Sequence, residues 1–254
     1  MLIELSELNV SDMAEVGLGK SQTAIMRTND RSGLIIKSPM YNILIDATSA
    51  TFPENFRPDI IMVTHEHSHH LDENFIFSLY KAMKNSKAVS AEQRPYGIAP
   101  PEDLPPIVTD QTSAVLLRRF ISRDLVKVMM PGEELPIDMV TVVSFRSNHP
   151  TAKTPLTYML VLDNGFRMYH ASDSLPNDDM KVVSEQEPDM AFVPIGLDPG
   201  VTPLSGAQVA SIVQPGTVVP FHGTDLQKFK TSVKKLRTKT HVQVMQPGEM
   251  QIYG

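Results

Sequence analysis

The stretch "DIIMVTHEHSHHLDE", residues 59–73, constrains this chain more than any other part of it. Its first half is a short apolar run preceded by Pro58, which predicts a strand. Four of the chain's eight histidines follow at once, within six positions. The histidine cluster therefore lies just past the end of a strand and before a region with helical spacing.

In an extended segment, alternate side chains share one face. We therefore expect His65, His67 and His69 to project together, with His70 joining them through the turn into the next helix. Three imidazoles on one face form a metal-binding arrangement. The alternative is a solvated histidine-rich loop. An affinity tag does not explain the run, because tags are terminal and this run is internal.

The composition limits the ligands and partners. With no cysteine among 254 residues, any metal must be held by histidine and carboxylate. A net charge of -6 argues against general nucleic-acid affinity. Glu4 and Glu7 stand where a secretory signal has basic residues, and no apolar stretch approaches the length of a membrane span. We therefore expect a cytoplasmic protein without a membrane span.

Short apolar strands alternate along the chain with turn signals and helical patterns. Apolar spacing predicts helices over 72–86 and 110–120, and an Asn-Gly pair predicts a hairpin over 156–172. The proline-rich stretch 99–108 is expected to be a stiff connection rather than a domain linker. Further strands are predicted over residues 23–28, 32–38, 41–47, 59–64, 138–147, 189–195 and 217–222.

The order of the predicted strands and helices indicates the domain organisation. Strands outnumber helices, and the candidate site residues come from both halves of the chain. This favours one α/β domain over residues 1–254 rather than two independent domains. No internal repeat can be aligned residue by residue.

The motif "THEHSHHLD" resembles that of the metallo-β-lactamase superfamily, which has His-x-His-x-Asp-His after a strand. Later stretches match the order of the family's other site residues: His149 in "FRSNHPTAKT", Asp173 in "MYHASDS" and His222 in "VVPFHGT". The resemblance covers nearly the whole chain and implies an αββα sandwich of two mixed β-sheets flanked by helices. The run of motifs looks most like the L-ascorbate-6-phosphate lactonase and N-acyl phosphatidylethanolamine phospholipase D branch.

The resemblance also implies the ligands of a binuclear site. Taken singly, His149 could be a loop histidine, Asp173 a helix cap and His222 a buried strand-end residue, but their joint order favours a metal site. Zinc, as one or two ions, suits such ligands best, with manganese, iron or nickel as alternatives. The implied ligands are His65, His67 and His149 for a first ion, His70 and His222 for a second, and a bridging, catalytic Asp173.

Position 69 departs from the family pattern, because the family has an aspartate there that binds the second metal and orients the hydroxide. We place His69 at that same metal-binding and catalytic position. With Asp173 as the one carboxylate, two divalent ions and a hydroxide leave a formal charge of about +2, roughly one unit above the family site. The second ion should then bind more weakly. Asp72 could accept a hydrogen bond from an imidazole, or act only as the acid at a helix N-terminus.

Two further features have ordinary explanations. His170 could line the site, but a strand histidine packed against its neighbours is the preferred interpretation. The basic run "LQKFKTSVKKLRTKT", residues 226–240, could clamp a phosphate or an RNA backbone. A solvated face of an amphipathic helix is the preferred interpretation there.

Together, these residues predict a metal-dependent hydrolase that uses a metal-bound hydroxide on a small-molecule substrate, namely a small anionic ester, lactone or phosphodiester. Two alternatives stay open. One is an RNA- or DNA-processing nuclease of the same fold, which only the basic run supports. The other is a metal-binding member without hydrolytic activity, which the missing aspartate suggests. Related small members often form symmetric oligomers, so a homo-oligomer is a further alternative.

Overall fold

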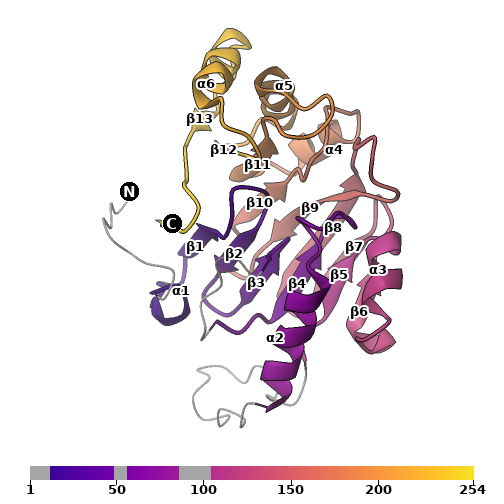
Figure 1. Cartoon of the computed structure of the whole chain (residues 1–254). Coiled ribbons are helices and arrows are strands. Elements are labelled where there is room, and N and C mark those ends of the chain that lie inside the picture. Colours follow the sequence, from indigo (N-terminus) through magenta and orange to yellow (C-terminus); the bar gives the residue numbers. More distant parts are fainter. Residues whose placement is uncertain (1–11, 49–55, 86–103) are drawn as a thin grey trace.

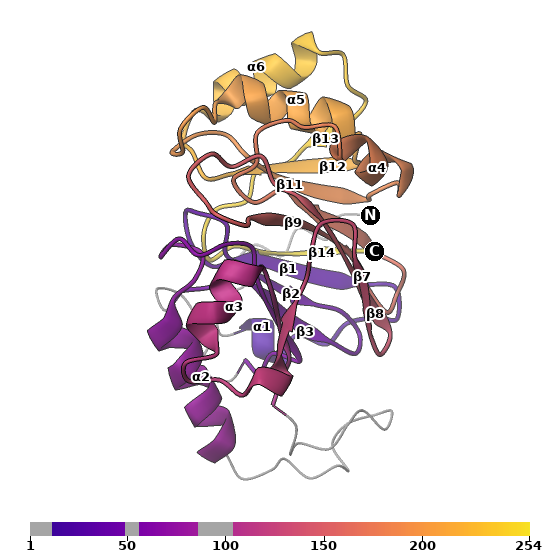
Figure 2. The ribbon, with the colours of Figure 1, turned by 90° about the vertical axis from the view of Figure 1, so that its right-hand side faces the viewer.

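The computed structural model describes residues 12–48, 56–85 and 104–254. Its strands form two seven-stranded sheets that pack face to face, with helices on both outer faces (Figures 1 and 2). The first sheet contains β1 (Thr23–Arg27), β2 (Leu34–Lys37), β3 (Asn42–Ile45), β4 (Ile60–Val63), β5 (Ile107–Thr109), β6 (Val126–Val128) and β14 (Met250–Tyr253). The second contains β7 (Glu134–Ile137), β8 (Val140–Arg146), β9 (Leu156–Val161), β10 (Arg167–His170), β11 (Met190–Pro194), β12 (Thr217–Phe221) and β13 (His241–Val242).

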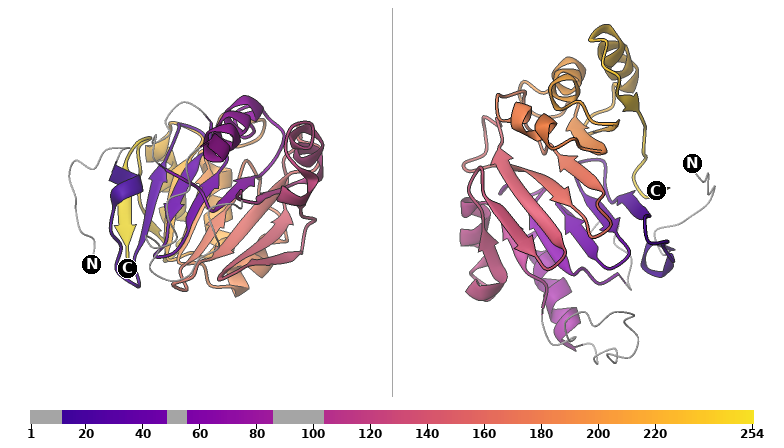
Figure 3. Two further views of the ribbon diagram at one scale, coloured as in Figure 1. Left: turned by 90° about the horizontal axis from the view of Figure 1, so that it is seen from below. Right: turned by 180° about the vertical axis from the view of Figure 1, so that it is seen from behind.

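The two sheets share one pattern of strand directions. In the first sheet, with the order β14-β1-β2-β3-β4-β5-β6, the pairs from β14 to β3 are antiparallel and those from β3 to β6 are parallel. In the second, β7 to β10 are antiparallel and β10 to β13 are parallel. The two halves of the chain therefore build similar sheets, although their sequences show no repeat. The C-terminal β14 pairs with β1 (Figure 3) and is the edge strand on that side of the first sheet.

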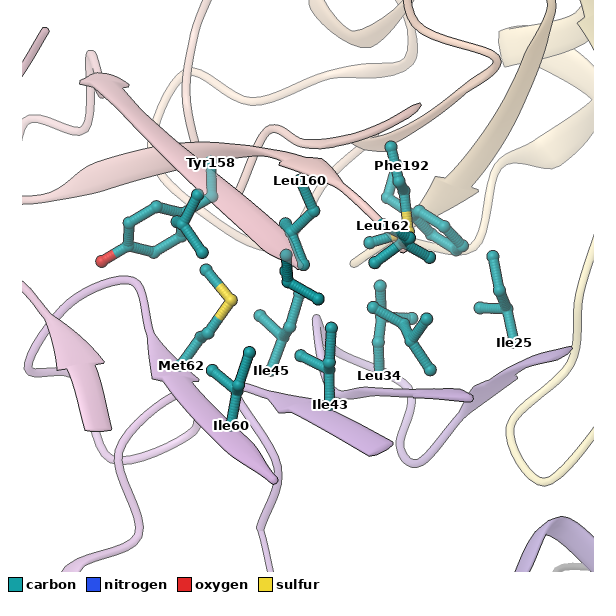
Figure 4. Packing of buried hydrophobic residues seen from close by; sticks show 14 of the residues in the cluster. Ile25, Leu34, Ile43, Ile45, Ile60, Met62, Tyr158, Leu160, Leu162 and Phe192 are labelled. Atoms are coloured by element: carbon teal, nitrogen blue, oxygen red, sulfur yellow. The ribbon is translucent and has the colours of Figure 1, made fainter. Parts of the chain in front are cut away.

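The apolar runs form strands because both faces of each sheet are covered. In β3, Ile43 and Ile45 face the core between the sheets, whereas Leu44 faces the outer helices. Figure 4 shows the core between the sheets, where Ile43 and Ile45 lie opposite Leu160 of the second sheet. The alternation of period two thus divides one apolar strand between two cores.

Helices complete the outer layers (Figure 2). The chain enters α3 at Asp110, whose carboxylate accepts hydrogen bonds from the backbone N–H groups of Thr112 and Ser113 and so caps the helix. Among residues 12–48, 56–85 and 104–254, no helix has the length and apolar character needed to cross a membrane. The first sheet is covered by α1 (Asp12–Glu15), α2 (Glu73–Asn85), α3 (Gln111–Leu117) and the 3-10 turn η2 (Arg123–Leu125), and the second by α4 (Met180–Glu185), α5 (Pro203–Val213) and α6 (Leu226–Lys235).

The observed elements confirm the predicted αββα sandwich of two mixed sheets flanked by helices. The hairpin of β9 and β10 turns at Asn164 and Gly165, and Gly165 has a φ of 83° that favours glycine. The basic run forms α6, which buries Phe229 and Val233 and leaves its lysines exposed, as expected for an amphipathic helix. Single-domain organisation over residues 1–254 stays a prediction.

The proline-rich stretch 99–108 differs from its prediction. Its residues 99–103 lie outside the described residues. Ile107 and Val108 begin β5 instead of continuing a connection, because they pair in parallel with β4 on one side and with the edge strand β6 on the other. β6, β7 and β14 were not predicted either, because strands of three or four residues are too short to give a clear pattern in the sequence. His241, expected in a C-terminal strand, begins β13.

The core between the sheets should dominate the stability of the fold. Leu160 is fully buried there, so Leu160→Ala should lower the free energy of unfolding by about 2–5 kcal/mol. Val115 on α3 is 62% exposed, and Val115→Ala should change it by less than about 0.5 kcal/mol. Equilibrium denaturation with urea measures both, and equal losses would contradict this account of the core.

Candidate metal centre

The candidate site is built from loops at strand ends of both sheets. The histidine motif follows β4, His149 follows β8, Asp173 follows β10, and His222 comes directly after β12. His65, His70, His149, Asp173 and His222 are all buried. The fold therefore brings together residues that are distant in the sequence, since His65 and His222 are 157 positions apart.

The backbone of the motif does not have the predicted geometry. Instead of an extended segment, the chain turns, and the His67 carbonyl accepts hydrogen bonds of 2.8 Å from the N–H groups of both His70 and Leu71. The expectation that His65, His67 and His69 share one face of an extended strand is therefore wrong. The turn divides the motif, because His67 lies toward His149 while His70 lies toward Asp173.

His65, His67 and His149 form the first group, in which one nitrogen from each imidazole lies within 4.8 Å of the others. His149 Nε2 and His67 Nδ1 are 3.2 Å apart. The loop before His149 is fixed from both sides, since the Asn148 N–H donates to Ser174 Oγ and the Asn148 carbonyl accepts from the Leu175 N–H. This holds His149 beside the loop that contains Asp173.

Asp173 is the centre of two further groups. Its Oδ2 lies 2.7 Å from His70 Nε2, 3.6 Å from His69 Nε2 and 3.8 Å from His65 Nε2. Its Oδ1 lies 3.3 Å from His222 Nδ1. The two groups, each with donor atoms within 4.8 Å of one another, are His65, His69, His70 and Asp173, and His69, Asp173, Asp198 and His222.

The charges in this cluster are set by burial and by opposite charge. Burial lowers the pKa of His65 well below its usual value and also lowers that of His149, so both are neutral imidazoles with a free lone pair. Burial alone would raise the pKa of Asp173, but His70 and the other imidazoles outweigh it and hold that pKa far below its usual range. Asp173 is therefore an anion.

His70 is held from behind by Asp46, the residue after β3. The His70 Nδ1–H donates to Asp46 Oδ2 at 2.7 Å, which directs Nε2 toward Asp173. The same carboxylate accepts from the backbone N–H and the hydroxyl of Thr64, at 2.8 and 2.7 Å, and from the hydroxyl of Ser32. Burial lowers the pKa of His70, but Asp173 and Asp46 outweigh it and raise this pKa to about 10.

Four strand ends next to the cluster adopt left-handed backbone conformations. The φ angles are 45° at Asp46, 50° at Ser172, 71° at Leu197 and 53° at His222. Non-glycine residues adopt such angles at a cost of order 1–3 kcal/mol each, and they concentrate at functional sites. The sharp turns allow side chains that follow a strand to point back over its end.

The other histidines lie outside the cluster. His170 is buried, its Nε2–H donates to the Ser32 carbonyl at 2.9 Å, and its Nδ1 accepts from the Ser172 N–H. It thus supports two loops of the site through hydrogen bonds and is buried among its neighbours, in agreement with the preferred interpretation. Asp72 accepts from the Phe75 N–H and so caps α2.

Sequence reasoning missed three side chains at the site, which are Asp46, Asp198 and Arg31. Asp46 lies near the end of the strand predicted over residues 41–47, and Asp198 comes shortly after the strand predicted over residues 189–195. An acid close to a strand end was the only signal in the sequence. Arg31 Nη1 lies 3.4 Å from His222 Nε2, across 191 positions of sequence. Its proximity depends on how the β1–β2 turn meets the second sheet, which the sequence does not encode locally.

The donor atoms of the cluster fit a bound metal. Buried polar atoms without a hydrogen-bond partner are uncommon in folded proteins and call for an explanation such as an ion. Neutral imidazoles and carboxylates at these separations are ligands for a transition metal. Among the described residues, the cluster contains six buried side-chain atoms without a hydrogen-bond partner: His65 Nε2, His69 Nε2, His149 Nδ1, Asp173 Oδ1, Asp198 Oδ2 and His222 Nδ1.

The sandwich and the histidine-aspartate cluster at its edge define a protein of the metallo-β-lactamase class. The family profile described as "Beta-lactamase superfamily domain" matches residues 28–222, and the chain belongs to this superfamily.

Relatives and solved structures agree with this assignment. The chain is 24% identical over 224 residues to a UPF0173 metal-dependent hydrolase of Methanopyrus kandleri, which covers 82% of this chain and 90% of the relative. It is 28% identical over 208 residues to one of Lysinibacillus sphaericus, with 76% and 80% covered. Igni18, a metallo hydrolase from Ignicoccus hospitalis, shares the fold with a TM-score of 0.71 and 18% identity over 92% of this chain and 99% of that one. The lactonase and phospholipase D branch is not confirmed by these relatives.

Asp46 should control metal affinity without contacting the metal. In Asp46→Asn the shape is kept, but the charge that orients His70 is lost, so zinc should bind about 10- to 100-fold more weakly. Competition with a chromogenic chelator measures this affinity. Asp178→Asn, at a side chain that is 92% exposed, is the matched control. Unchanged zinc affinity in Asp46→Asn would refute the role given to Asp46.

Proposed function

We propose that this chain is a metal-dependent hydrolase that acts on a small anionic ester, lactone or phosphodiester. The observation that supports it best is the convergence of buried donor atoms without hydrogen-bond partners at one edge of the sandwich. The names of the relatives, metal-dependent hydrolases, support the same class of activity. The cytoplasmic location and a homo-oligomeric state stay predictions.

The proposed ligands follow the three groups of donors. His69 belongs with the second ion, because its ring stacks on that of His222 with centroids 5.4 Å apart, and its Nε2 is 3.6 Å from Asp173. We assign His65, His67 and His149 to the first ion, His69, His70 and His222 to the second, and Asp173 to both.

Zinc is the metal that this ligand set favours. Imidazole nitrogens dominate the cluster and the chain has no thiolate, so zinc suits the site and magnesium or calcium does not. Manganese, iron and nickel are the alternatives. When bound, a pair of such ions polarises the scissile bond and lowers the pKa of water toward neutrality.

Residues of the chain supply the rest of the mechanism. Asp173 stays ionised because of the surrounding imidazoles, so it can hold two cations together. The His69 side chain is 31% exposed, whereas those of His65 and His70 are buried. His69 is therefore placed to contact a substrate that approaches from solvent.

The position of Arg31 favours a substrate with an anionic group. Its guanidinium lies 3.4 Å from His222, and its side chain is 36% exposed, so it borders the cluster from the solvent side. A guanidinium at such a place recognises a phosphate or carboxylate through paired hydrogen bonds. We assign Arg31 to the anionic group of the substrate.

Removal of metal tests the proposed activity. Protein treated with a chelator and then dialysed should lose hydrolysis of a chromogenic panel of phosphodiesters, lactones and thioesters, and two equivalents of zinc should restore it. Metal analysis of protein purified without added metal gives the native ion. His241→Ala, an exposed histidine on β13, should behave as the unmodified protein. Turnover that survives complete metal removal would contradict the proposal.

Replacement of Arg31 tests the substrate class. Arg31→Ala should raise KM for anionic substrates by roughly tenfold, because a charge-assisted hydrogen bond contributes about 1.5–3 kcal/mol, and should leave neutral lactones little changed. Lys230→Ala, at an exposed lysine of α6, is the control. If Lys230→Ala impairs turnover and Arg31→Ala does not, the nuclease alternative is favoured instead.

A further inference from the structure

Asp198 enters the cluster from the loop after β11. Its Oδ2 lies 2.8 Å from His222 Nδ1, and its side chain is only 10% exposed. The two atoms are close but not aligned for a hydrogen bond, and neither has a hydrogen-bond partner among the described residues. Asp198 therefore presents a carboxylate oxygen to the same space as Asp173 and His69.

The backbone fixes the loop that carries this carboxylate beside the loop of His222. β11 and β12 are parallel and end together, with Pro194 opposite Phe221, and the Ile195 N–H donates to the Phe221 carbonyl at 3.0 Å. A Cβ on Gly223 would lie 2.8 Å from the Gly196 nitrogen, so only glycine lets the two loops approach this closely.

The orientation of His222 indicates what the carboxylate does. His222 Nε2 faces the guanidinium of Arg31 at 3.4 Å, a position where a metal cation would be repelled. Nδ1 faces Asp173 at 3.3 Å and Asp198 at 2.8 Å. The nitrogen that would face a metal is thus Nδ1, so Asp198 lies on the metal side of the ring and not behind it.

The charge of the site also favours Asp198 as a metal ligand. With Asp173 as the single carboxylate, the predicted site is about one unit more positive than that of the family, because His69 replaces an aspartate. One additional carboxylate at the second ion removes that excess. Asp198 is the additional carboxylate that shares a donor group with His69 and His222.

We propose that Asp198 is a ligand of the second metal ion and supplies the carboxylate that the family pattern takes from position 69. The proposal rests on the proposed binuclear site. In this chain the acid comes from the loop after β11, and an imidazole occupies the position after β4.

Zinc titration of metal-free protein by calorimetry tests whether Asp198 replaces the carboxylate that the family has at position 69. Unmodified protein should bind two equivalents. Asp198→Asn keeps the shape and removes the charge, so the first equivalent should stay and the second should weaken by at least about tenfold. The double variant His69→Asp with Asp198→Asn should recover most of the lost affinity, because the carboxylate returns to the family position. Asp178→Asn, a change at an exposed carboxylate, should match the unmodified protein.

The outcomes separate this inference from the proposed function. If unmodified protein binds no zinc, the proposed function fails. If it binds two equivalents and Asp198→Asn does so with unchanged affinity, the inference fails alone. A loss in Asp198→Asn that His69→Asp does not relieve would also overturn it, because Asp198 would then act by holding His222. Circular dichroism of the metal-free variants verifies folding, and Asp198→Ala repeats the test with a smaller side chain.

Discussion

The chain of buried charges from Asp46 through His70 to Asp173 joins the two sheets at the edge where the site lies. Asp46 follows β3 of the first sheet, and Asp173 follows β10 of the second. His70 lies between them, 2.7 Å from an oxygen of each, and all three side chains are buried. A buried charge is costly unless it is paired and hydrogen-bonded. The sheets must therefore pack in the register that brings both carboxylates to this imidazole.

The rest of the cluster depends on this connection. Thr64 binds Asp46 through its N–H and its hydroxyl, which fixes the point where the motif leaves β4. The Ser172 hydroxyl donates to Thr64 Oγ1 at 2.9 Å, which ties the loop of Asp173 to the same point. These hydrogen bonds hold imidazoles and carboxylates from separate loops within reach of one another, and such preorganisation strengthens binding.

Much of the fold follows from local patterns in the sequence. Apolar runs such as residues 41–47 predict buried strands, and Asn164 with Gly165 predicts the hairpin, because both signals depend on neighbouring residues alone. A turn into the helix was predicted at His70, but it begins already at His67, whose carbonyl accepts from the His70 and Leu71 N–H groups. Alternating histidines are equally compatible with an extended segment and with a turn, so the sequence alone did not locate its start. Asp198 was missed for another reason: its place beside His222 depends on the pairing of β11 with β12 and on the close approach at Gly223.

We propose that the cluster holds two metal ions between the sheets, and anomalous diffraction from crystals of the zinc-loaded protein would locate them. We expect two zinc peaks about 3.5–4 Å apart, one next to His65, His67 and His149 and one next to His222, with Asp173 between them. Anomalous difference maps without a peak in the cluster, or zinc bound only by residues elsewhere, would rule out a metal centre at these residues.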